Sequence, residues 1–231
     1  MNRIATRLLA VLAPAALLLP AAAHADQMTF DDAAGDGKAV NMAVALGGLL
    51  GGSTQEGPLL LDAPAETSTD VVRTTIDHAR KRLTLTVQLR DLVDATGSSV
   101  EFRIVTPRGR YALTAGVMDG RTIADLSPLG RGGETVTVSE DGAVTVTVGP
   151  VEKPCRTVRA RYDVAADTLT ASAPTSCLGS PRWVKVAAGL SRTQVTPQAD
   201  GSANIASFVD DAFRGGVSLE SLGRSPKVRR G

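Results

Sequence analysis

The stretch Leu83-Thr84-Leu85-Thr86-Val87-Gln88-Leu89-Arg90 alternates strictly between apolar and polar residues. Successive side chains of a β-strand point to opposite faces, so this spacing predicts a strand with one buried and one solvated face. The run before it, residues 70–78, is rich in β-branched side chains, and the short segment 79–81 separates the two runs. Together they predict an antiparallel hairpin.

The same two-residue period recurs along the chain, whereas a helical period is almost absent. Further strand pairs are expected around turn segments that contain proline, glycine or aspartate, at 107–110, 140–142 and 165–168. Single strands are expected at 27–30, 39–46 and 183–188. About ten strands at this spacing are typical of an all-β protein, and pairing two sheets buries their apolar faces most simply. We therefore predict an antiparallel β-sandwich.

Residues 1–25 have the three parts of a secretory signal peptide. Arg3 and Arg7 supply the positive charge, residues 8–19 supply a short apolar stretch, and residues 23–25 (Ala-His-Ala) fit the pattern that signal peptidase cuts. A membrane anchor is the less favoured alternative, since about 20 apolar residues are needed to span a bilayer. The sequence thus predicts a secreted, extracellular chain that keeps no integral membrane segment after cleavage.

The chain after the signal peptide is expected to form one β-sandwich domain over residues 26–216. Within it, residues 47–66 are rich in glycine, proline and short polar residues, which predicts a long flexible loop. Residues 217–231 are basic and contain few apolar side chains, which predicts a disordered tail that frays in solvent.

The chain has two cysteines, Cys155 and Cys177. An even number of cysteines in an exported protein favours a disulfide between them. The alternative, a reactive or metal-bound pair, lacks the close spacing and the additional ligands of such sites. The bridge would join the two strands expected on either side of the 165–168 turn, at the open end of that hairpin.

The charge balance argues against polyanionic partners. The full chain has 25 basic and 24 acidic residues, and the expected signal peptide removes two arginines and no acid. The remaining chain is therefore close to neutral and has no electrostatic footprint for nucleic acid or an anionic membrane. An extracellular or cell-envelope partner of unknown identity is expected instead.

Motifs for common catalytic chemistry are missing from the sequence. Only one histidine, His78, follows the signal peptide, and a Gly-x-Ser-x-Gly motif is absent, so a Ser-His-Asp hydrolase has no support. A surface or cross-strand position is expected for this histidine. One histidine also excludes multi-histidine metal sites. The glycine-rich run 47–52 lacks the lysine of a nucleotide-binding P-loop.

Carboxylates are the remaining candidate site. Three lie close together within residues 30–37 and two within residues 208–213, namely Asp31, Asp32, Asp36, Asp210 and Asp211. Calcium takes six to eight oxygen ligands, and carboxylates on a tight, glycine-containing loop suit it. Apolar residues flank both groups and would hold them near one end of a sandwich. The sequence thus predicts a calcium site, with a simple turn plus a solvated acidic pair as the alternative.

The run 167–186, DTLTASAPTSCLGSPRWVKV, resembles a strand–turn–strand unit of secreted actinobacterial proteins of unassigned function. It is also similar to sandwich domains of the DOMON and family 9 carbohydrate-binding class, as is the segment 30–36. The resemblance implies a sandwich over residues 27–213. Members of those families bind sugars or haem, but this chain has few aromatic residues beyond Trp183, and no Met/His haem ligands can be assigned. The resemblance therefore implies the fold and no particular ligand.

Two functional hypotheses follow from the sequence. The first is a non-enzymatic secreted binding or cell-envelope interaction module, held by one disulfide and a calcium ion. The second is a carboxylate-based hydrolase of glycans or envelope polymers, which would need an acid/base pair of carboxyls roughly 5 to 10 Å apart in a cleft. The sequence leaves the choice between binding and catalysis open.

Overall fold

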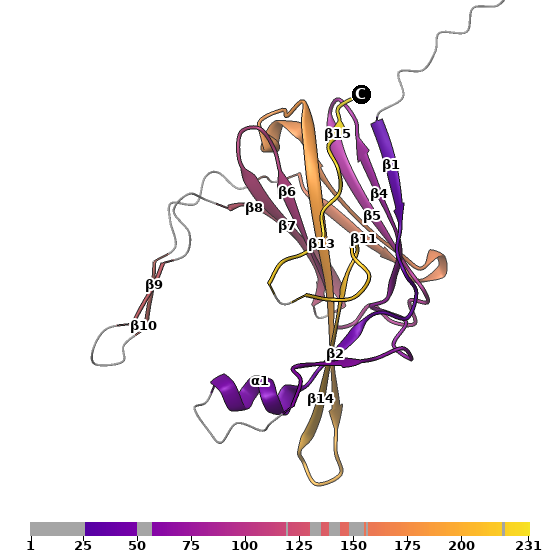
Figure 1. The fold of residues 1–231 in the computed structure, drawn as a ribbon, viewed down its shortest axis with the longest axis vertical. Coiled ribbons are helices and arrows are strands. Elements are labelled where there is room, and N and C mark those ends of the chain that lie inside the picture. The colour runs from indigo at the N-terminus through magenta and orange to yellow at the C-terminus, as the bar shows by residue number, and fades with distance from the viewer. Residues whose placement is uncertain are drawn as a thin grey trace, which may run out of the picture.

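The computed structural model describes residues 26–49, 57–118, 120–129, 135–138, 144–147, 155, 157–218 and 220–231. Within these residues, two antiparallel sheets pack face to face (Figure 1). The predicted β-sandwich is therefore confirmed. The expected signal peptide, residues 1–25, lies outside the described residues.

The smaller sheet has five strands in the order β1-β4-β5-β12-β11. They are β1 (Asp26–Asp31), β4 (Val71–His78), β5 (Arg82–Leu89), β12 (Thr168–Pro174) and β11 (Arg159–Asp163). The larger sheet has the order β3-β2-β14-β13-β6-β7-β8, and β15 also pairs with β13. Its strands are β3 (Leu60–Asp62), β2 (Lys38–Val40), β14 (Ala203–Asp211), β13 (Trp183–Pro197), β6 (Ser98–Val105), β7 (Arg110–Met118), β8 (Arg121–Leu129) and β15 (Val228–Arg229).

A separate pair of strands, β9 (Thr135–Val138) and β10 (Val144–Thr147), forms a two-stranded sheet. The described helical segments are short: α1 (Met42–Leu49) and the 3₁₀ turns η1 (Val164–Ala166) and η2 (Thr175–Leu178). No helix in the described ranges has the length and apolar character that a membrane span requires.

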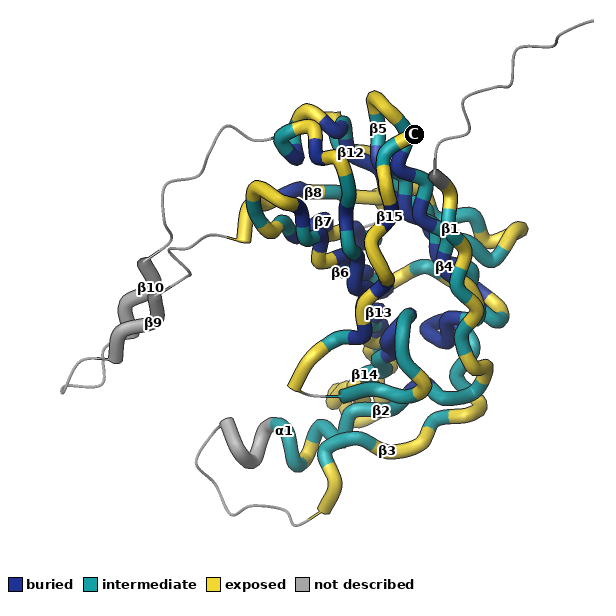
Figure 2. Tube along the Cα trace, turned by 45° about the horizontal axis from the view of Figure 1, so that its top comes forward, coloured by how far each residue is buried: buried dark blue, intermediate teal, exposed yellow. Residues whose placement is uncertain are grey.

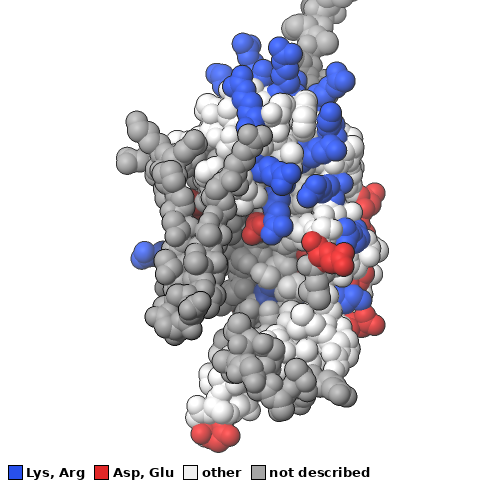
Figure 3. Space-filling view, turned by 60° about the vertical axis from the view of Figure 1, so that its left-hand side comes forward, with Lys and Arg blue, Asp and Glu red and all other residues white. Residues whose placement is uncertain are grey.

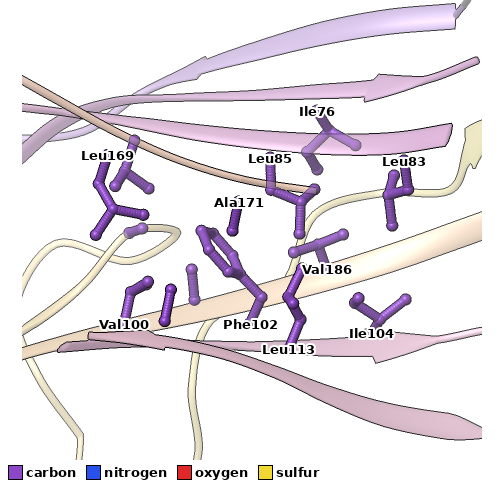
Figure 4. Packing of buried hydrophobic residues seen from close by; sticks show 14 of the residues in the cluster. Ile76, Leu83, Leu85, Val100, Phe102, Ile104, Leu113, Leu169, Ala171 and Val186 are labelled. Carbon is purple, nitrogen blue, oxygen red and sulfur yellow. The ribbon is translucent and has the colours of Figure 1, made fainter. Parts of the chain in front are cut away.

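The core lies between the two sheets. On β5 the apolar residues of the alternating stretch are buried and the residues between them are partly exposed, as predicted. Leu85 and Ile76 of the smaller sheet face Phe102 and Val186 of the larger one (Figure 4). Buried residues accordingly follow the strands of both sheets (Figure 2). Each fully buried side chain of this size stabilises the fold by about 1.5 to 3 kcal/mol.

The predicted hairpin of 70–78 and 83–90 is formed by β4 and β5, with Ile76 opposite Leu85. Of the two positions expected for His78, the cross-strand one agrees with the register, in which it lies opposite Leu83. The surface position is wrong, because His78 has the same parity as Ile76 and therefore points into the core. Its side chain is fully buried, and its Nδ1 lies 3.2 Å from the carbonyl oxygen of Val228. This histidine is a structural residue of the core.

The predicted disulfide is confirmed. Cys155 and Cys177 are bonded, with their Cα atoms 6.0 Å apart. Cys177 lies in η2, directly after β12, and β12 pairs with β11 in the register Tyr162–Leu169. The bridge therefore ties the start of the 157–174 hairpin to the loop that leads into β13.

Removing this bridge should destabilise the protein by about 3 kcal/mol, the chain-entropy value for a loop of this size. The Cys155→Ala/Cys177→Ala variant should show this as a lower urea midpoint with a steeper slope, because the unfolded chain without the cross-link exposes more surface. The wild-type protein under reducing conditions is the matched comparison and should lose the same amount. An unchanged midpoint in both cases would show that the bridge contributes nothing to stability.

The expectation of a frayed C-terminal tail is wrong, because residues 222–231 pack along β13. Ser225 donates its backbone N–H to Val186 O (2.8 Å), and the Val186 N–H donates to Ser225 Oγ (2.9 Å). Val228 is fully buried. The paired partner β14 covers only residues 189–197 of β13, so the other half of this long strand would leave unpaired backbone groups. The tail satisfies them.

The segment 39–66 also differs from expectation. The strand expected at 39–46 is only β2, and α1 follows it after Asn41, whose Oδ1 accepts the Val44 N–H (3.4 Å). Asparagine is a strong helix N-cap, and the alanine and leucine after it favour a helix. The loop expected at 47–66 is interrupted by the end of α1 and by β3. Residues 50–56 lie outside the described part.

Candidate metal centre

Carboxylates from three separate segments meet at one end of the sandwich. Asp32 and Asp36 lie in the turn after β1, Asp70 directly precedes β4, and Asp210 lies near the end of β14. One carboxylate oxygen each of Asp36, Asp70 and Asp210 lie within 4.8 Å of one another. We call Asp32, Asp36, Asp70 and Asp210 the acidic cluster.

Two aromatic side chains hold the segments of the acidic cluster together. Phe30 at the end of β1 and Phe213 after β14 make an edge-on contact with ring centroids 5.4 Å apart. The expectation that flanking apolar residues anchor the N- and C-terminal acidic segments near each other is therefore met. Between Asp32 and Asp36, Gly35 has φ +84°, a left-handed conformation that glycine adopts without a steric penalty.

Backbone N–H groups orient each carboxylate. Asp210 accepts from Val71 N (2.7 Å) and from Asp211 N (2.8 Å). Asp70 Oδ2 accepts from Gly35 N (2.8 Å), and Asp36 Oδ2 accepts from Gly216 N (2.6 Å). Hydrogen bonds to a charged acceptor are stronger than neutral ones. The cluster is therefore fixed in place by the backbone around it.

Three oxygens of the acidic cluster have no donor. Asp32 Oδ2, Asp36 Oδ1 and Asp70 Oδ1 are buried and accept no hydrogen bond from the described residues. Asp70 is only 1% exposed to solvent and Asp210 only 2%. A buried acceptor without a partner costs about 1 to 3 kcal/mol, and more if it is charged. This arrangement is unfavourable unless a cation or protons compensate it.

One cation reaches the cluster from the protein itself. Arg90 Nε lies 2.9 Å from Asp70 Oδ2, while its Nη2 donates to Pro64 O (2.6 Å) and Glu66 O (2.9 Å). Arg90 thus ties the loop before β4 to one carboxylate of the cluster. Among the described residues, this single guanidinium opposes four carboxylates, which leaves a net negative site.

The pKa values reflect this imbalance. Burial raises the pKa of Asp210 to about 7, although the N–H groups of Val71 and Asp211 lower it. Burial likewise raises the pKa of Asp32 to about 6, and the charges of Asp36 and other neighbouring carboxylates raise it further. Burial is also the main cause of the raised pKa of Asp70. These carboxylates are therefore buried first of all, and their like charges add to the cost of ionising them together.

The donor set suits a hard divalent cation. Carboxylate oxygens are preferred by calcium, magnesium and manganese, whereas zinc and copper favour the histidine and cysteine ligands that the cluster lacks. Three buried oxygens without hydrogen bonds are available to such an ion. The predicted class of site therefore fits the residues that the fold brings together.

The structure brings together three of the five predicted ligands, Asp32, Asp36 and Asp210. Asp31 points away, is exposed, and pairs with Arg73 Nε (2.7 Å). Asp211 lies beside the cluster and is fully buried, but its Oδ2 accepts from Gly223 N (2.6 Å) and its Oδ1 from Phe213 N (3.2 Å). Asp211 therefore holds the C-terminal segment instead of offering free oxygens.

Asp70 was missed from the sequence because it was assigned to the β4 strand. Its position can be deduced from strand pairing. β1 and β4 are antiparallel, with Asp31 opposite Arg73, so the residues before β4 lie next to the residues after β1. An acid just before β4 is then a neighbour of Asp32.

Two other residues considered from the sequence have ordinary surroundings. Trp183 is partly buried, and Lys227 Nζ lies 4.6 Å from the centre of its ring, so a cation–π contact occupies the face that a sugar would need. On β11, Arg159 is exposed and Arg161 pairs with Asp163 (2.7 Å).

Protein-family models, curated proteins and solved structures were compared with this chain, and none of them matches it.

Proposed function

We propose that the protein is a secreted β-sandwich binding module whose acidic cluster holds a calcium ion. The observation that carries the proposal is a set of three buried carboxylate oxygens, on Asp32, Asp36 and Asp70, that accept no hydrogen bond from the part of the chain that the structure describes. A calcium ion would supply the positive charge that this site lacks. Secretion accords with the predicted signal peptide and with the disulfide, because disulfides persist outside the cytoplasm.

The ion would join parts of the chain that are far apart in sequence. Asp36, Asp70 and Asp210 come from the turn after β1, the approach to β4 and the end of β14. A bound ion that bridges them would cross-link the smaller and larger sheets at this end of the sandwich. The loops at the same end would then present a binding surface whose shape depends on calcium.

A hydrolase is supported less well. A cavity of about 440 Å³ on the larger sheet is lined by Glu101, Asp210 and Glu220, among others. Asp210 has the raised pKa of a general acid, but both of its oxygens accept backbone N–H groups and it is only 2% exposed. Glu101 is held by Arg103 (2.6 Å). This leaves Glu220 as the one exposed carboxyl group among these three that is not paired with a described residue, whereas glycoside hydrolysis needs two carboxyl groups.

The test of the proposed calcium site is a thermal melt of residues 26–231 in chelator and then in 10 mM calcium. Calcium should raise the midpoint by roughly 5 to 10 °C, because a hundredfold excess over the dissociation constant adds about 2.7 kcal/mol. Asp36→Asn keeps an oxygen for the Gly216 N–H and removes one ligand oxygen. It should abolish the calcium shift and, by removing a buried like charge, raise the midpoint in chelator.

The matched control is Asp200→Asn in the exposed turn between β13 and β14. It makes the same chemical change far from the acidic cluster and should keep the full calcium shift. A wild-type midpoint that does not respond to calcium, magnesium or manganese would rule out the metal site. In that case the cluster is compensated by protons alone.

A further inference from the structure

Basic side chains gather at the end of the sandwich opposite the acidic cluster. Figure 3 shows Lys and Arg concentrated on the upper part of one face. Asp70 precedes the eight-residue strand β4 and Arg80 follows it, so the two ends are separated by roughly 27 Å. The charges of this nearly neutral chain are therefore segregated in space.

The basic end is built from four segments without any acidic residue: 79–82, 106–110, 179–182 and 227–231. Their charged residues are Arg80, Lys81, Arg82, Arg108, Arg110, Arg182, Lys227, Arg229 and Arg230. None of them forms an ion pair with a described residue. The near-neutral composition had predicted no electrostatic footprint, but this end has one.

Three of these arginines line one pocket. It has a volume of about 270 Å³, and its lining residues are Pro107, Arg108, Ser180, Pro181, Arg182 and Arg230. The guanidinium groups come from the β6–β7 turn, the loop before β13 and the C-terminal segment. None of the described residues that line the pocket carries a carboxylate, so the positive charge of these arginines has no counterpart among them.

The local backbone fixes two of the guanidinium groups. Arg108 Nη1 donates to Gly179 O (2.9 Å), and Arg230 Nη1 donates to Ser180 O (3.2 Å). Both carbonyl groups belong to residues in the left-handed region, with φ +73° at Gly179 and +49° at Ser180. A non-glycine residue with this φ is strained, and such strain is often found at binding sites.

Covalent and backbone bonds hold this strained loop in place. Ser180 N donates to Thr175 O (2.7 Å), and Cys177 in the same loop carries the disulfide to Cys155. The carbonyl groups that orient Arg108 and Arg230 are therefore fixed before any ligand arrives. A guanidinium group keeps several donors in a planar fork, which matches the oxygens of a phosphate group.

We propose that this pocket binds a phosphate group of a linear, phosphate-bearing polymer. Its volume is below the 300 to 1,000 Å³ typical of sites for whole small molecules, so it suits one charged group of a larger ligand. The cations around it, which include Arg80, Lys81, Arg110 and Lys227, would contact neighbouring phosphates along the chain. This site is separate from the acidic cluster.

The test titrates the oxidised, full mature chain with inorganic polyphosphate and, in parallel, with inorganic phosphate, by calorimetry at low salt. Polyphosphate should bind, and binding should weaken steeply with added salt because counterions are released. Arg182→Gln should weaken it about tenfold, the loss expected for one charge-assisted contact. Arg182 makes no side-chain hydrogen bond to a described residue, so the fold should persist, which the melting midpoint checks.

The control is Arg121→Gln at the start of β8. It removes the same charge from an exposed arginine that lies outside the basic end, and it should leave binding unchanged. If inorganic phosphate binds tightly and Arg182→Gln abolishes that binding, the pocket is a phosphate site. Its ligand would then be the free ion, and the polymer part of the proposal would be wrong. Absence of binding, or equal weakening by both substitutions, would overturn the proposal.

Discussion

Metal-free protein should become more stable as the pH falls from 8 to about 5. Asp210 and Asp32 have pKa values of about 7 and about 6 in the folded protein, against 3.8 for an aspartate fully exposed to water. The folded state therefore binds more protons than the unfolded state in this range, and stability falls as the pH rises. One pKa unit corresponds to about 1.4 kcal/mol, so Asp210 alone contributes on the order of 3 kcal/mol.

The trend should reverse in more acidic solution. Below a pH of about 4 the unfolded carboxylates also take up protons, and the exposed Asp62, Asp94 and Asp200, whose pKa values are lowered by hydrogen bonds, lose their favourable contacts. The measurement is the free energy of unfolding by urea at each pH, in buffers freed of divalent ions. Stability that is flat or that rises between pH 5 and 8 would contradict the prediction.

Two further measurements test whether the acidic cluster causes this pH dependence. Asp32→Asn keeps the acceptor for the Ala33 N–H (2.9 Å) and removes a group that titrates in this range, so it should flatten the slope. Calcium competes with protons for the same oxygens. In 10 mM calcium the added stability should be largest above pH 7 and small at pH 5, which separates metal binding from a general effect of salt.

Deleting residues 222–231 should lower the free energy of unfolding by about 4 kcal/mol, from lost apolar burial and unpaired polar groups. Val228 loses its buried site, the Val186 N–H loses Ser225 Oγ, and the buried Asp211 loses the Gly223 N–H as a donor. The measurement is urea unfolding in near-neutral buffer, where the deletion variant should have a lower midpoint than the full chain. The free energy of unfolding should fall both with and without calcium.

The control for the deletion removes charge and keeps the backbone. Arg224 and Arg229 are exposed, so Arg224→Ser/Arg229→Ser should change stability by less than about 0.5 kcal/mol. A point variant tests the same contact, because a Cβ at Gly223 would lie 2.6 Å from Phe213 O. Gly223→Ala should therefore reproduce part of the loss. A deletion as stable as the full chain would mean that the tail does not support the sandwich.

Strands that bury one face could be predicted, because every second residue of such a strand is apolar. The alternation in β5 and the pairing of β4 with β5 are examples. β8 was not predicted, since most of its residues are exposed and only Leu126 is buried. β8 is an edge strand that pairs with β7, and its sequence shows no alternation of apolar and polar residues.

The second limit of prediction from the sequence was the position of residues that are far apart in the chain and meet in the fold. Asp32 and Asp36 were correctly grouped because they are neighbours in sequence, and the Phe30–Phe213 contact brings Asp210 to them. Asp70 joins them only through the register of β1 and β4. The basic end could not be deduced from net charge, because composition does not say which turns share one end of a sandwich.

The packing of residues 222–231 on β13 also sets the order in which the chain can fold during its synthesis. These residues leave the ribosome after β1 to β14, yet they cover half of a central strand and reach β4 through the hydrogen bond from the Gly231 N–H to His78 O (3.1 Å). Contacts between such distant segments form late. In a chain that is exported as proposed, these contacts can form only after β4 and β13 have left the translocation channel, so the part of β13 before residue 189 is covered late.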